Sequence, residues 1–244
     1  MNKPIWLAAE YHFPSLYSCR MPLSSDFSAL SLPAPGPATV RLALIRAGIE
    51  SFGVEVVREK LFPTIRAMNI VIRPPDKVAI TGQKIHGYKS IAGRRNERVR
   101  VNESIIYREY CHAEGPLVIY ICIPRAEEAR FREMLDIVGY WGKSDSLTFY
   151  RRITYGQPQI GEGAVSLASI PAQNLTKNCG EYFTAALTEF KVSDVAWMDI
   201  LPVLRQNQSN FLITEIYVWP LVFIEQRSSG KILHYCSLRD IMKA

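Results

Sequence analysis

The chain has 244 residues, 48% of them apolar, and a formal net charge of +6. This length and apolar content are ample for a packed core, and the chain could form either one large domain or a main domain with a smaller annex. The N-terminal apolar run is too short for a signal peptide, and no segment approaches the ~20 apolar residues of a membrane span. We therefore expect a soluble, cytoplasmic protein, whose basic excess permits an anionic partner without identifying one.

The cysteines argue against metal or disulfide chemistry. They are odd in number, widely spread, and in no metal-finger spacing with a histidine: Cys19, Cys111, Cys122, Cys179 and Cys236. We expect reduced thiols, no structural zinc and no cofactor. The sequence also lacks the phosphate-binding GxxxxGK, the dinucleotide GxGxxG and the GxSxG nucleophile motif.

The first half alternates strand and helix patterns. Residues 4–13 predict a buried strand that stops at Pro14. A Pro- and Ser-rich lead follows, and apolar residues at helical spacing predict a helix over 37–52, with Pro37 in its first turn and Gly53 as its cap. On this helix, Arg41 and Arg46 are expected at the more hydrated edge. A second short helix is expected over 55–65.

Two strand pairs and a further helix complete this half. Residues 66–82 predict two strands around a Pro-Pro turn, and residues 102–125 predict two more around a Gly-Pro turn. Residues 126–142 predict a helix with acidic side chains in its first turn. This order gives an α+β fold, which can form an elaborated split β-α-β unit over residues 1–142.

Residues 143–244 are less regular and predict a smaller β-rich part packed on the first. The expected strands are 146–155, 163–173, 181–190, 194–204 and 211–226, with helix possible in the third and fourth.

The stretch KIHGYKSIAGRRNERVR, residues 84–100, has six Lys or Arg side chains and one acidic one. Its cations could contact phosphates, while His86 and Tyr88 could stack on unpaired bases, a combination used in single-stranded RNA recognition. If about six phosphates were bound, log affinity would fall with log salt at a slope of roughly −4. A solvated charged hairpin explains the same composition.

A third hypothesis for this stretch is metal-independent RNA cleavage. His86 could transfer a proton, and Lys84 or Lys89 could stabilise developing charge. Elsewhere, Glu109 and His112 are expected to be surface residues beside a turn. The segment GYWGKSDS, residues 139–146, could contact phosphate or simply cap the preceding helix.

Taken in order, these features resemble the fifth-subunit (Cas five) family of CRISPR-associated proteins, in the RAMP superfamily of class 1, type I, Cascade-like complexes. The resemblance rests on the N-terminal strand, LSLPAPGPATVRLALIRAG entering the first helix, the basic insertion, and YREYCHAEGPLVIYICIP before the second helix. Within the first helix entry, Pro33, Pro35, Thr39 and Arg41 match the family.

The resemblance implies a ferredoxin-like (RRM-like) domain at 1–142, a protruding basic β-hairpin thumb at about 77–110, and a smaller β-rich part at 143–244. It implies a noncatalytic ribonucleoprotein subunit for antiviral defence, which holds the 5′ handle of a guide RNA (crRNA) beside the backbone and large subunits. Target DNA near the recognition motif is a further expected partner, and no membrane is involved.

One branch of the family cuts precursor RNA, and here His86, Tyr88 and Lys89 offer the residue types it uses. A protein-interaction module with an acidic partner is another alternative. For RNA binding, the expected residues are Arg20, Arg41, Lys84, His86, Tyr88, Lys89, Arg94, Arg95, Arg98, Arg100 and Lys143.

Overall fold

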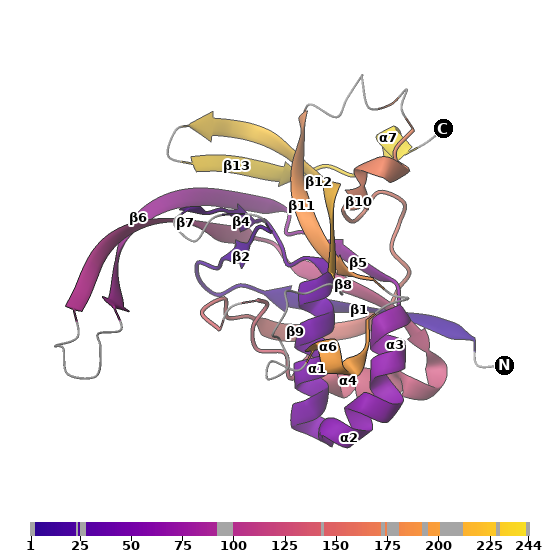
Figure 1. Ribbon diagram of the computed structural model, residues 1–244. Coiled ribbons are helices and arrows are strands. Elements are labelled where there is room, and N and C mark those ends of the chain that lie inside the picture. Colours follow the sequence, from indigo (N-terminus) through magenta and orange to yellow (C-terminus); the bar gives the residue numbers. More distant parts are fainter. Residues whose placement is uncertain are drawn as a thin grey trace.

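The computed structural model shows a mixed fold of helices and strands (Figure 1). It describes residues 3–22, 24, 28–91, 100–142, 144–171, 174, 181–191, 195–200, 212–227 and 230–242. Side chains are described for these residues except in the ranges 87–91 and 100–104. In the described part of the chain, no helix has the length and apolar content needed to cross a membrane.

Four antiparallel strands form a first sheet, called sheet A, in the order β5-β8-β1-β9. Their bounds are Ile70–Arg73 for β5, Leu117–Pro124 for β8, Pro4–His12 for β1 and Phe149–Tyr155 for β9. Along β1, Leu7, Ala9 and Tyr11 alternate and are fully buried. The Tyr11 hydroxyl donates a hydrogen bond to the Leu135 carbonyl of α4 at 2.6 Å, so this face of the sheet packs against helices.

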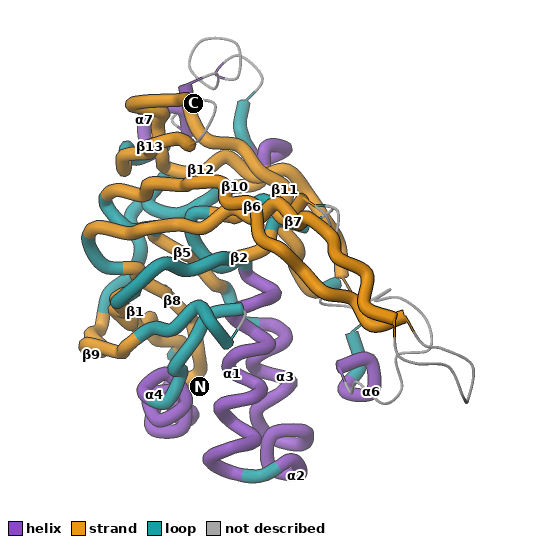
Figure 2. Tube along the Cα trace, turned by 90° about the vertical axis from the view of Figure 1, so that its left-hand side faces the viewer, coloured by secondary structure: helices purple, strands orange, loops and turns teal. Residues whose placement is uncertain are grey.

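Helix α1 spans Pro37–Phe52, between β1 and β5, and α4 spans Glu128–Asp136, between β8 and β9. Helix α1 begins at its predicted proline and ends at Gly53, whose φ of 81° lies in the left-handed region. The chain continues as α2 (Val54–Val56), a π-helical turn (Val57–Leu61) and α3 (Phe62–Ala67), which together confirm the predicted second helical segment. Figure 2 shows α1 and α3 side by side below the strands.

A second, seven-stranded sheet, called sheet B, has the order β10-β12-β13-β6-β7-β3, and β11 also pairs with β12. Its strands are β3 (Ser28–Ala29), β6 (Lys77–Ile91), β7 (Arg100–Glu114), β10 (Val165–Ser166), β11 (Tyr182–Phe190), β12 (Leu212–Arg227) and β13 (Gly230–Tyr235). The remaining short elements are β2 (Cys19–Arg20), β4 (Ser31–Leu32), α6 (Trp197–Ile200) and α7 (Arg239–Met242), with 3-10 turns at Arg125–Glu127 and Leu167–Ser169.

Both sheets cross the expected boundary at residue 142. Strand β9 lies after that residue in the chain, yet it pairs with β1 in sheet A. Strands β6 and β7 lie before it, yet β6 pairs with β13 in sheet B. The two parts of the chain therefore share backbone hydrogen bonds in both sheets.

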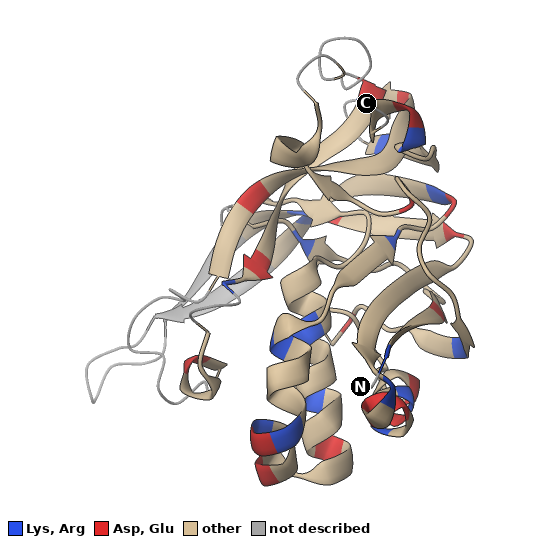
Figure 3. Cartoon of the chain, turned by 90° about the vertical axis from the view of Figure 1, so that its right-hand side faces the viewer, with Lys and Arg blue, Asp and Glu red and all other residues tan. Residues whose placement is uncertain are grey.

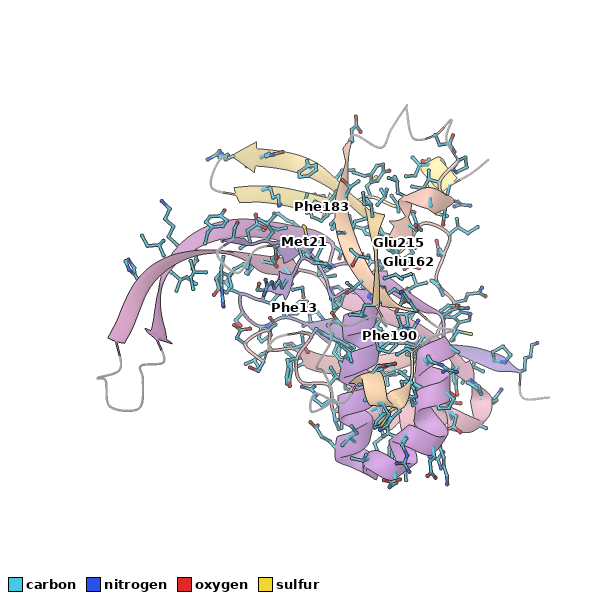
Figure 4. All side chains as sticks on the ribbon, viewed as in Figure 1. Phe13, Met21, Glu162, Phe183, Phe190 and Glu215 are labelled. Atoms are coloured by element: carbon cyan, nitrogen blue, oxygen red, sulfur yellow. The ribbon has the colours of Figure 1, made fainter. Side chains whose placement is uncertain are left out.

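Arg41 of α1 joins the first half of the chain to β11. Its Nε donates to Glu189 Oε1 at 2.8 Å, Nη2 donates to the Met68 carbonyl at 2.9 Å, and Nη1 donates to the Ile65 carbonyl. Phe190, labelled in Figure 4, has its ring centroid 5.8 Å from the guanidinium. Arg41 is only 4% exposed. It therefore does not lie at a hydrated edge, as predicted, but forms a buried ion pair. This burial also argues against its predicted role as an RNA contact.

Replacement of Arg41 by Met should therefore lower the free energy of unfolding by about 3–5 kcal/mol, because it leaves the Glu189 carboxylate without its cation. Urea unfolding followed by circular dichroism measures the change. The control is Arg58→Met in the exposed part of the helical segment, expected within about 0.5 kcal/mol of the wild type. A loss at Arg41 no greater than that of the control would contradict the assignment.

Candidate nucleic-acid interface

The described residues of the basic stretch, 84–91 and 100, lie on a long antiparallel hairpin of β6 and β7. Backbone pairing is continuous from Lys77 opposite Glu114 to Ile91 opposite Arg100. Figures 1 and 2 both show the hairpin extending beyond the body of the molecule. The outer edge of β6 is paired with β13 only from Lys77 to Thr81, so the basic stretch begins shortly after that support ends.

The base of the hairpin is fixed on its other side through Glu109 of β7. Glu109 Oε2 accepts the Ser31 backbone N–H of β4 at 2.9 Å, and Oε1 lies 3.7 Å from Lys231 Nζ of β13. The same ammonium group is 5.2 Å from the ring centroid of Phe183, which Figure 4 labels. Of the two residues expected beside a turn, His112 is exposed, but Glu109 is buried and 9% exposed. Glu109 is thus an anchor joining β7 to β4 and β13.

Buried thiols and hydroxyls pack at this base. Cys111 of β7 contacts Ser31 Oγ at 3.3 Å, and the Tyr17 hydroxyl donates to the Pro33 carbonyl at 2.6 Å. Burial raises the pKa of the Cys111 thiol to about 12 and raises that of Cys19 well above its usual value. Because the thiolate is the reactive form, these two cysteines are structural rather than nucleophilic.

Above the anchor, one face of the hairpin presents a cation and two rings. Gly82, Lys84 and His86 alternate along β6 and share a face, and the backbone register sets Tyr107 opposite Lys84 and Ile105 opposite His86. Lys84 and His86 are exposed, and Ile105 is 60% exposed. This face can offer charge, an imidazole and apolar surface to a ligand.

Tyr107 lies across Gly82, where a side chain would block it. A Cβ at Gly82 would overlap the hydroxyl and ring atoms of Tyr107. Tyr107 could not be singled out from the sequence, because its proximity to Lys84 follows from the strand register and not from spacing along the chain. The signal available in the sequence was Gly82, a glycine in a predicted strand, whose missing side chain leaves room for a large residue of a neighbouring strand.

Apart from the buried Arg41, the predicted contact residues fall into three groups. Lys84 and His86 are described and exposed on β6, and Arg20 is exposed on β2, where its Nη2 donates to the Ser24 carbonyl at 2.9 Å. For three others the backbone is described in β6 or β7: Tyr88 (opposite Glu103), Lys89 (opposite Asn102) and Arg100 (opposite Ile91). Outside the described residues lie Arg94, Arg95, Arg98 and Lys143.

Charge on the rest of the molecule is mixed. Figure 3 shows Lys and Arg interspersed with Asp and Glu over the helices and sheets that face the viewer. Several arginines of the body are ion-paired, such as Arg152 with Glu10 at 2.6 Å and Arg130 with Glu127 at 3.0 Å. The mixture of signs on this face contrasts with residues 84–100 of the sequence, which contain six Lys or Arg residues and one acidic residue.

The Tyr107–Gly82 contact can be tested by a double-mutant cycle. Gly82→Ala should lower the free energy of unfolding by about 1–3 kcal/mol, because the new methyl group displaces the ring. In a Tyr107→Ala background the same change should cost much less, since the overlap is gone. Gly139→Ala, where a Cβ meets nothing within 4 Å, is the control. Equal losses in both backgrounds would show that the contact is absent.

Comparison with known proteins gives one clear sequence relationship. No family model matches the chain. It is 29% identical over 150 residues to the CRISPR-associated protein Cas5 of Archaeoglobus fulgidus, a match that covers 61% of this chain and 64% of that protein. The chain therefore matches less than two thirds of the length of this relative.

Solved structures give weaker similarities. A chain of the Type III-B Cmr-beta complex bound to cognate target RNA aligns with a TM-score of 0.49 and 10% identity, covering 63% of this chain and 61% of that one. A CRISPR protein from Archaeoglobus fulgidus aligns with a TM-score of 0.43 and 11% identity, covering 95% and 92%. Both TM-scores are below 0.5, so the sequence relationship is the informative one. By sequence, the chain is a relative of the CRISPR-associated protein Cas5 over 150 residues.

Proposed function

We propose that the chain is a noncatalytic RNA-binding subunit of a Cascade-like CRISPR effector complex, in which it holds the 5′ handle of the guide RNA. The observation that carries the proposal is the basic stretch: six cations occur within residues 84–100, and the strands that enter and leave this stretch are anchored at their base on both sides. The relationship to Cas5 supports the same conclusion.

The arrangement of sheet A supports the proposed architecture. Its order β5-β8-β1-β9, with α1 after β1 and α4 after β8, fits a split β-α-β unit. We therefore propose a ferredoxin-like domain, from which β6 and β7 project as a thumb inserted between β5 and β8. Strands β10 to β13 would form the β-rich C-terminal part that supports the thumb.

The anchored base gives this thumb a physical advantage in binding. A flexible single strand loses conformational freedom when it binds, and an ordered protein surface limits the additional cost of ordering the protein. The cations would supply sequence-independent affinity for phosphates, while His86 and Tyr88 would stack on bases. The contacts proposed on the hairpin are Lys84, His86, Tyr88, Lys89, Arg94, Arg95, Arg98 and Arg100, with Arg20 and Lys143 outside it.

The proposed partners are the guide RNA, the repeated backbone subunit and the large subunit, with target DNA near the recognition motif as a further contact. The complex would act in the cytoplasm in antiviral defence.

Alanine replacement of the four hairpin arginines, Arg94, Arg95, Arg98 and Arg100, tests RNA binding. Each lost phosphate contact should reduce the magnitude of the salt slope by ~0.7, so the total change should be about 3. Binding of fluorescent repeat RNA to the purified protein across a salt series measures it.

The matched control replaces four arginines that are already paired with carboxylates: Arg58, Arg130, Arg152 and Arg227. This variant removes the same formal charge and should keep most of the slope. An unchanged slope in the hairpin variant, or equal changes in both variants, would contradict the proposal.

The alternative function, metal-independent cleavage of precursor RNA, draws on His86 and Lys84 being exposed two residues apart on β6. The residue directly opposite His86 is the apolar Ile105, which cannot transfer a proton. Incubation of the protein with repeat RNA in EDTA should therefore leave the RNA intact. Cleavage that disappears in a His86→Ala variant would establish the alternative in place of the noncatalytic proposal.

A further inference from the structure

Helix α1 carries a second arginine, Arg46, whose surroundings differ from those of Arg41. The two are five residues apart, so their side chains point about 140° apart around the helix. Arg41 is buried and donates to a carboxylate and two carbonyl groups. The Arg46 side chain is 27% exposed, and its nearest acidic group, Glu50 Oε1, is 3.8 Å from Nε and itself 58% exposed.

The Arg46 guanidinium is held on an aromatic ring. Its Cζ atom lies 3.6 Å from the centroid of the Tyr140 ring, a stacking distance that fixes the plane of the cation. Among the described residues, its buried Nε has no hydrogen-bond acceptor. Buried donors are usually satisfied, so the protein leaves some of the hydrogen-bonding capacity of this cation unused.

Arg46 lines a small pocket between α1 and the loop that follows α4. The pocket measures ≈ 250 Å³ and is lined by Thr39, Leu42, Ala43, Arg46, Tyr140 and Gly142. The first four follow helical spacing and share one face of α1. The loop is held by a hydrogen bond from the Thr148 N–H to the Gly139 carbonyl at 2.9 Å. Both walls of the pocket, the helix and the loop, are therefore held in place by backbone hydrogen bonds.

The size and charge of the pocket limit what it can bind. Drug-sized ligands occupy roughly 300–1,000 Å³, so this pocket suits one chemical group rather than a whole cofactor. The guanidinium already covers one face of the Tyr140 ring, which disfavours a base stacked there. Glu50 is its ion-pair partner among the described residues, and an exposed ion pair at this distance is weak.

We infer that this pocket binds one phosphodiester group of a nucleic-acid strand through Arg46. The inference rests on the proposed RNA-binding function and adds to it a contact on the body of the protein, away from the hairpin. A planar guanidinium presents paired N–H donors that match phosphate oxygens, and stacking on Tyr140 would orient them before RNA arrives.

Salt titration of repeat-RNA binding tests the inference. Arg46→Gln should reduce the magnitude of the salt slope by ~0.7, the value for one phosphate, and weaken binding roughly tenfold. Arg46→Lys should retain the slope, because it keeps the charge. Arg58→Gln, which removes an arginine already paired with Glu55, should change neither quantity.

A second variant addresses the pocket without altering its arginine. Glu50→Gln removes an exposed competing carboxylate, so the fold should be retained and RNA binding should tighten about 2–5-fold. Glu55→Gln is its matched control and should leave affinity unchanged.

The outcomes separate this inference from the proposed function. If the wild type binds RNA with a hairpin-dependent slope while Arg46→Gln keeps the wild-type slope, the Arg46 site is overturned and the hairpin proposal stands. Equal effects of the Arg46 and Arg58 variants would also overturn it. If Arg46→Gln does not fold, the Glu50 variant decides, and unchanged affinity there overturns the site. No RNA binding by the wild type would overturn both proposals.

Discussion

Antiparallel pairing of β13 with β6 is the interaction on which the architecture depends. Backbone hydrogen bonds from residues 230–234 to residues 77–81 make the hairpin part of a sheet whose other strands, apart from the short β3, come from the end of the chain. An isolated two-stranded hairpin is marginally stable in water. Lateral support from β13, together with the Glu109 anchor, explains how strands of this length can leave the body from a fixed base.

A buried ion pair makes a further connection between the two parts of the chain. Arg41 bridges α1, the carbonyl groups near the end of α3, and Glu189 of β11. Two positive side chains on one helix thus have different roles: Arg41 supports the fold, and Arg46 faces a pocket. The two arginines have the same formal charge, but they differ in their exposure and in the number of N–H donors that already have an acceptor within the protein.

Local patterns predicted much of sheet A and its helices. The β1 strand, α1 with its proline start and glycine cap, β8 and α4 all follow from apolar spacing and turn residues. The strands on either side of the basic stretch also followed from the sequence, because these segments carry strong strand patterns. Their pairing did not: they were predicted in two pairs around the Pro-Pro and Gly-Pro turns, whereas β6 pairs with β7 and β5 pairs with β8.

The remaining features of the fold and of the site were not predicted, because they depend on contacts between residues that are far apart in the chain. Glu189 lies 148 residues from Arg41, so nothing in the local sequence identified Arg41 as a buried ion-pair residue. Strand β13 was not predicted, and β9 was expected in the second part, because partner choice between distant strands depends on tertiary structure. For the same reason nothing in the local sequence singled out Tyr107 or Arg46. The contact of Tyr107 with Gly82 depends on strand register, and the contact of Arg46 with Tyr140 depends on a loop that follows a different helix.

Direct mapping of RNA contacts tests the central claim. Repeat RNA carrying 4-thiouridine in its 5′ handle can be photo-crosslinked to the protein, alone and in its natural complex, and the crosslinked peptides identified by mass spectrometry. If the basic stretch binds the RNA, crosslinks should fall within residues 84–100 and should be lost when unlabelled repeat RNA competes. Competable crosslinks confined to other parts of the chain, with none in the hairpin, would contradict this claim.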